Sequence, residues 1–194
     1  MLGQLPKALT VNGKSYAIRS DYRNILRIFE AFADPNLTDN DKLFICLKRI
    51  YVDFAKIPKS DLKEAYEQAH WFIGCGQAEE KRPPMRTFNW VKDAPIIFPA
   101  VNKAAGMEVR ETQYMHWWTF MGYFQSIDSE SLFGTVLSIR QKKAKGKKLE
   151  KYEKEFCNNN KALMALDDET VSSQHKSPEE QMQEIFNELL KGGE

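Results

Sequence analysis

"MHWWTFMGYF", residues 115–124, places two adjacent tryptophans beside a histidine. Large apolar and aromatic side chains recur here at spacings of three and four residues: Tyr114, Trp117, Trp118, Met121 and Phe124. Such a pattern is typical of a densely packed core helix, here at about residues 111–126. One tryptophan, Trp117 or Trp118, could instead stay partly exposed as an anchor for a partner. A catalytic role is disfavoured, because His116 has no partner for a triad in the sequence pattern.

Helical periodicity continues on both sides of this stretch. Helices are predicted at 20–34, 39 to about 54, 60–73, 89–105, 130–142 and 148–156. Pro95 and Pro99 indicate that the helix at 89–105 either begins near Asp93 or is kinked at Pro99. Residues 8–19 are predicted to form a β-hairpin, because Asn12-Gly13 suits a type I′ turn. The expected fold is mainly α, with about six or seven helices and a small N-terminal β-hairpin.

The charge distribution divides the chain into two predicted parts. The net charge is +1, yet residues 162–194 hold two lysines against eight acidic residues, a net −6, which leaves +7 on residues 1–161. We predict a helical domain at 1–161 and, at 162–194, an acidic linker followed by a C-terminal amphipathic helix. That helix, at 178–191, carries one apolar stripe: Met182, Ile185, Phe186, Leu189 and Leu190. The stripe could dock on its own body, lie in a partner's groove, or mediate homo-oligomerisation.

A basic run follows the sixth predicted helix. Its candidate phosphate-binding residues are Arg140, Lys142, Lys143, Lys145, Lys147 and Lys148. Lysines at this density could neutralise phosphates, but arginine, the better reader of bases, occurs only once among them. The pattern favours a solvated connection between helices over a nucleic-acid site. The run could also receive the acidic tail.

Sequence motifs for enzymatic chemistry are missing. Neither a phosphate-binding glycine loop, nor a nucleophile elbow, nor the spacing of a zinc site is found, so we expect no enzyme, no cofactor and no metal. No run of about 18 apolar residues occurs, and "MLGQLPKALTV" at 1–11 is unlike a signal peptide. We therefore expect no membrane span, and three reduced cysteines in a cytoplasm.

Several segments together resemble the bacteriophage gene-product-fifteen family, encoded in the tail gene cluster of Gram-positive siphophages and their prophages. They are "VNGKSYAIRSDYRNILRIFE" (11–30), "FIGCG" (72–76), "FNWVKDAPIIFPAVNKAAGMEV" (88–109), "MHWWTFMGYFQSI" (115–127) and "LFGTVLSIR" (132–140). The resemblance covers about residues 8–160. The H-W-W-x-F element, following D-A-x-x-I, carries most of its specificity.

The resemblance implies a non-enzymatic role in tail morphogenesis. Family members are thought to be tail assembly chaperones, which would coat the tape-measure protein in the host bacterial cytoplasm until tail-tube subunits polymerise around it. The expected partners are therefore the tape-measure protein, tail-tube subunits, or both. Expected contact residues are one of the two tryptophans and the C-terminal stripe. One alternative is a structural virion component, such as a connector or tail-completion subunit, and a less favoured one is a nucleic-acid-binding module using residues 140–154.

Overall fold

The computed structural model of the chain describes residues 3–77 and 87–166. This part is mainly helical and holds one antiparallel strand pair, which confirms the predicted fold class. Its strands are β1 (Ala8–Val11) and β2 (Lys14–Ala17). Its α-helices are α1 (Tyr22–Ala33), α2 (Asp39–Ile50), α3 (Leu62–Ile73), α4 (Ala94–Ala105), α5 (Trp117–Gln125), α6 (Leu132–Ala144), α7 (Lys151–Asn159) and α8 (Lys161–Met164). Short 3-10 helices lie at Phe54–Lys56, Lys59–Asp61 and Val109–Glu111.

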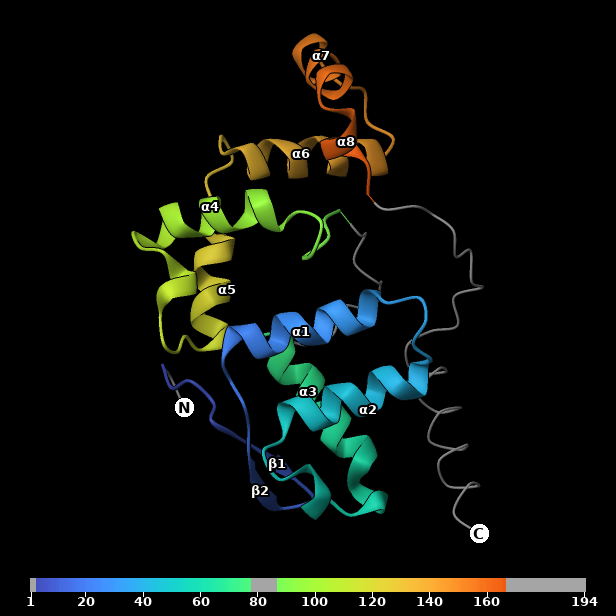
Figure 1. The fold of residues 1–194 in the computed structure, drawn as a ribbon, viewed down its shortest axis with the longest axis vertical. Coiled ribbons are helices and arrows are strands. Elements are labelled where there is room, and N and C mark those ends of the chain that lie inside the picture. Colours follow the sequence, from blue (N-terminus) through green and yellow to red (C-terminus); the bar gives the residue numbers. More distant parts are fainter. Residues whose placement is uncertain (1–2, 78–86, 167–194) are drawn as a thin grey trace.

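The molecule is elongated (Figure 1). The hairpin and α1–α3 form one end, α4 and α5 lie in the middle, and α6–α8 form the other end. One large apolar core extends from β1 to the start of α6. A smaller cluster joins α6 to α8 through Val136, Ile139 and Met164. The sequence did not predict α8, a single turn that packs on α6 and α7.

The hairpin forms where it was predicted. Asn12 and Gly13 both have positive φ angles, 47° and 76°, as a type I′ turn requires. Leu9 and Val11 alternate with exposed neighbours and face α3, so one side of the strand pair is buried by a helix. Two strands alone are marginally stable, and this packing supplies the missing apolar contact.

The hairpin also ends α2 earlier than predicted. The backbone N–H groups of Arg19 and Val52 donate to Ile50 and Ala17 respectively, so the chain after Ile50 is extended alongside β2. The predicted helix from 39 to about 54 therefore stops at Ile50, and Phe54 lies in a separate 3-10 turn. Pairing with the hairpin outweighs the helical periodicity here.

The start of α1 is joined directly to the start of α5. Asp21 accepts a hydrogen bond from the backbone N–H of Arg23 as the N-cap of α1 and another, at 3.1 Å, from that of Met115. Trp117 N–H donates to Ser20 O at 2.7 Å. Residues about 94 positions apart in the sequence therefore run side by side.

Prolines decide where α4 begins. The helix starts at Ala94, directly after Asp93, with Pro95 in its first turn, which confirms the alternative that it begins near Asp93. Residues 89–93, included in the longer range 89–105, are not helical. Pro99 lies inside the helix on an exposed face. Residues 89–93 are then free to form the turn that shapes the candidate site.

Candidate partner-binding site

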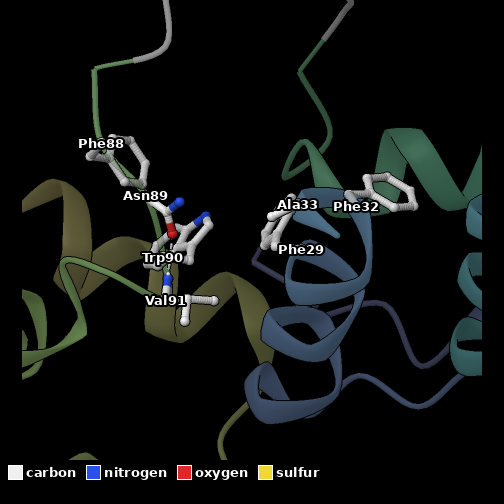
Figure 2. Close-up of a pocket in the computed structure, with 7 residues that line it drawn as sticks. All are labelled: Phe29, Phe32, Ala33, Phe88, Asn89, Trp90 and Val91. Atoms are coloured by element: carbon white, nitrogen blue, oxygen red, sulfur yellow. Dashed lines mark hydrogen bonds between the residues drawn. The ribbon is translucent and has the colours of Figure 1, made fainter. Parts of the chain in front are cut away.

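An apolar hollow of about 220 Å³ lies between the C-terminal half of α1 and the segment before α4. Figure 2 shows its two walls, one from α1 and one from residues 88–91. Its lining residues are Phe29, Phe32, Ala33, Phe88, Asn89, Trp90 and Val91. The aromatic rings of Phe29 and Trp90 stack at 5.9 Å between centroids, which links the two walls. Val91 at the rim is 54% exposed.

The wall at 88–91 is held by a tight turn. Asn89 Oδ1 accepts hydrogen bonds from the backbone N–H groups of Val91 at 2.8 Å and Lys92 at 3.1 Å. Asp93 Oδ2 accepts from Asn89 N–H at 2.9 Å. These bonds fix the direction in which Trp90 and Val91 leave the backbone, so the apolar wall is preorganised.

Behind this wall lies a buried ion pair. Arg140 Nη1 and Nη2 donate to the two carboxylate oxygens of Asp93 at 2.6 and 2.9 Å, and the two side chains are only 3% and 1% exposed. The same guanidinium donates to the carbonyls of Thr87 and Leu163 at 3.2 and 2.6 Å. One arginine thus connects α6 to the site wall and to α8. Such a bidentate pair suits the planar fork of arginine.

This geometry corrects the predicted basic patch. Arg140 cannot contact phosphate, because its charge is neutralised and its side chain is buried. Lys142 donates to Glu153 at 2.5 Å, and this hydrogen bond raises the pKa of Lys142 and lowers that of Glu153. Exposed lysines remain at Lys143, Lys145, Lys147 and Lys148. Because Arg140 is buried and Lys142 is paired with Glu153, two of the six candidate phosphate-binding residues are already engaged within the protein. The nucleic-acid alternative is weaker as a result.

The two tryptophans close the C-terminal end of α3. Trp117 Nε1 donates to Ile73 O and Trp118 Nε1 to Phe72 O, both at 2.8 Å. The last carbonyls of a helix lack partners within the helix, so these bonds satisfy them. Gly76, with φ of 78°, lets the chain pass the Trp118 ring, because a Cβ there would lie 3.1 Å from Trp118 Cη2.

Trp117 and Trp118 differ in exposure. Trp117 is 1% exposed and belongs to the core, so the prediction that it could serve as a partner contact is wrong. Trp118 is partly buried and packs edge-on against Trp71, which is 39% exposed. A contact role for Trp118 stays a prediction.

His116 is the N-cap of α5. Its Nδ1 accepts from Trp118 N–H at 3.0 Å, so in the neutral ring the proton is on Nε2, which donates to Pro6 O at 2.9 Å. Burial lowers the pKa of His116 below its ordinary value, 6.5. Protonation would turn Nδ1 into a donor facing another donor, which would break the cap.

A pH-dependent stability follows from His116. A histidine whose pKa is lowered by folding binds more protons in the unfolded chain, so stability falls as pH drops through 6.5 towards the folded-state pKa. We expect the free energy of unfolding to decrease between about pH 7.5 and about pH 5.5. His116→Asn keeps a capping oxygen and cannot titrate, so it should flatten this part of the profile. Urea unfolding at several pH values measures the difference, and equal slopes in both proteins would contradict the assignment.

The predicted C-terminal stripe cannot be placed. Its residues, Met182, Ile185, Phe186, Leu189 and Leu190, lie outside the described part of the chain.

Metal ligands, membrane spans and cysteines were the other features considered in the sequence. Across 3–77 and 87–166 no cluster of three or more metal-ligating side chains occurs. Within those same ranges no helix has the length and apolar character to cross a membrane. Burial raises the pKa of Cys46 to about 12 and of Cys75 to about 11, so both thiols stay protonated near neutral pH.

The comparison with protein-family models decides the family. The model described as Bacteriophage Gp15 protein matches residues 1–166, which include both walls of the hollow and the Arg140–Asp93 pair. The chain belongs to the Bacteriophage Gp15 protein family. No curated protein and no solved structure matches the chain. Membership in the Gp15 family indicates a structural or morphogenetic role in a bacteriophage and confirms the resemblance seen in the sequence.

The sequence did not single out the hollow of this Gp15 family member. Phe29 and Phe32 belong to the apolar face of the first predicted helix, and Trp90 falls within the predicted helix at 89–105. One signal was available, the aromatic pair in "FNW" at 88–90 directly before an Asp-Ala helix start. This pair indicates a site only when the position of α1 is known, because Phe29 and Phe32 of α1 form the facing wall.

Proposed function

We propose that the protein is a non-enzymatic tail assembly chaperone. It binds apolar helical segments of the phage tape-measure protein in the host cytoplasm, before tail-tube subunits replace it. Family membership supports a phage morphogenetic role. The observation that carries the binding proposal is the preorganised aromatic hollow between α1 and residues 88–91.

The size and chemistry of the hollow favour a side-chain anchor as its occupant. At about 220 Å³ it is smaller than the 300–1,000 Å³ typical of small-molecule sites. Its lining is aromatic and aliphatic apart from Asn89, whose side-chain oxygen is already used in the local turn. An apolar knob from an amphipathic helix meets these requirements. Many weak contacts of this kind, summed along a long helical protein, would give stable coverage.

Placing a charge at the rim of the hollow tests the proposal. Val91→Glu is expected to reduce co-purification of the co-expressed tape-measure protein at least about tenfold, because a carboxylate would be desolvated by an apolar contact. Val91 is 54% exposed, so the substitution should leave the fold intact. The matched control is Val52→Glu, a valine that is 44% exposed and does not line the hollow.

Either of two results would count against the proposal, the first against the hollow as its binding surface and the second against the chaperone function itself. If Val91→Glu and Val52→Glu co-purify with the tape-measure protein equally well, the hollow is not the binding surface. If the protein is present in purified phage particles at stoichiometric amounts, the structural alternative, a connector or tail-completion subunit, is favoured instead.

A further inference from the structure

The hollow leaves apolar surface open to solvent in the described part of the molecule. Val91 and the exposed Ala33 flank it from opposite walls, and the rings of Phe29, Phe32 and Phe88 are only partly buried. Covering such surface is favourable, because it removes apolar area from water. A segment tethered nearby would therefore compete for it with any free partner.

The described chain ends close to this hollow. Leu163 O and Thr87 O both accept hydrogen bonds from the guanidinium of Arg140. Thr87 is followed directly by Phe88 in the site wall, and only two residues lie between Leu163 and Leu166, the last described position. The described chain therefore ends near the wall at 88–91.

The linker is long enough to bring the C-terminal stripe to the hollow. Residues 167–177 number eleven, which span about 36–40 Å when extended. A flexible chain of eleven residues has an average end-to-end distance of about 17–20 Å. A tether of this length gives an effective concentration on the order of millimolar, so modest affinity is enough.

The sequence of the tail fits this occupant. Met182, Ile185, Phe186, Leu189 and Leu190 follow one another at the spacing of a single helix face. Residues 162–194 carry a net −6 and residues 1–161 a net +7, so the tail is attracted to the body that holds the hollow. The apolar stripe therefore offers the same kind of side chain that the proposed function assigns to the partner helix.

We propose that the apolar stripe at 182–190 of the same chain occupies the hollow between α1 and residues 88–91 and is displaced by the partner. The stripe acts as an internal competitor that keeps aromatic surface covered until the partner is present. This regulatory part rests on the proposed function, whereas the docking itself does not.

Docking can be measured without any partner. In the full chain, methyl NMR should show the Val91 resonances shifting when Phe186→Asp is introduced, since the stripe would leave the hollow. Val52 methyls serve as the internal control and should not move. Val91 resonances that are unchanged in both Phe186→Asp and Leu189→Asp would overturn the proposal. A shift that vanishes on dilution, together with a dimer mass at high concentration, would also overturn it by identifying a second copy as the source of the stripe.

A second experiment separates this inference from the proposed function. If the stripe competes, Phe186→Asp should raise the affinity for the tape-measure protein about tenfold or more, because the hollow becomes available in every molecule. Methyl shifts without any tape-measure binding would uphold the docking and reject the chaperone function. The opposite result is also possible: Val91→Glu abolishes tape-measure binding, but Phe186→Asp neither strengthens it nor shifts the Val91 methyl resonances. That result would uphold the chaperone function and reject the docking.

Discussion

Arg140→Met is expected to lower the free energy of unfolding by about 3–5 kcal/mol. The substitution leaves the carboxylate of Asp93, which is 1% exposed, buried without its cation. It also removes the donors to Thr87 O and Leu163 O. Breaking a buried pair costs far more than its net attraction, because the remaining charge cannot be hydrated. Equilibrium unfolding in urea, followed by circular dichroism, measures the loss.

The control for Arg140 lies three residues away on the same helix. Lys143→Met removes the same charge from an exposed position of α6 and should change stability by no more than about 0.5 kcal/mol. Combining Arg140→Met with Asp93→Asn should recover part of the loss, since the uncompensated charge is then gone. A cost below about 1 kcal/mol for Arg140→Met would show that water or another cation reaches Asp93.

Trp117→Ala is expected to cost about 3–5 kcal/mol, the range for removing a large aromatic side chain from a core. Trp117 is 1% exposed and contacts the rings of Phe29, Trp90 and Phe120. Its loss would leave a cavity between α1, α5 and the wall of the hollow. It would also leave Ile73 O at the end of α3 without its donor. Thermal unfolding of the full chain would show the change as a lower midpoint.

Trp118→Ala is the matched comparison. Its indole makes an equivalent hydrogen bond, to Phe72 O, but its ring is only partly buried, so its removal should cost less. Trp117→Phe removes the indole N–H and keeps most of the ring volume, so its cost sets an upper limit on the contribution of the hydrogen bond to Ile73 O. If Trp118→Ala were the more damaging of the two, the core position assigned to Trp117 would be wrong.

Local patterns in the sequence were enough for most of the elements. Asn12-Gly13 predicted the hairpin, because Asn and Gly readily adopt the positive φ angles of a type I′ turn without help from distant parts of the chain. The apolar spacing of α1, α3 and α5 was also readable, since one helix face carries the core residues. Boundaries were less accurate where distant segments decide them, as at Ile50, where pairing with the hairpin ends α2.

The candidate site was less predictable than the helices. Arg140 looked like the first member of a basic run, and only the placement of Asp93 beside it shows that it is buried. A sequence gives the charge of a side chain but not which distant carboxylate will neutralise it. The different roles of Trp117 and Trp118 could not be predicted for the same reason. In the sequence, a tryptophan that bonds to the end of another helix looks the same as one that fills a core.

The joining of the N-terminal segment to α5 has a consequence for the order of events during synthesis. His116 bonds to Pro6 across 110 positions, and Ser20 to Tyr114 across 94. At about 5–20 residues per second, roughly 5–20 s pass between translation of the first partner and of the second. During that interval the apolar faces of the hairpin and α1 have no α5 to cover them. We expect the nascent chain to be vulnerable to aggregation and to host proteases until residue 118 has emerged, and then to close in a single late step.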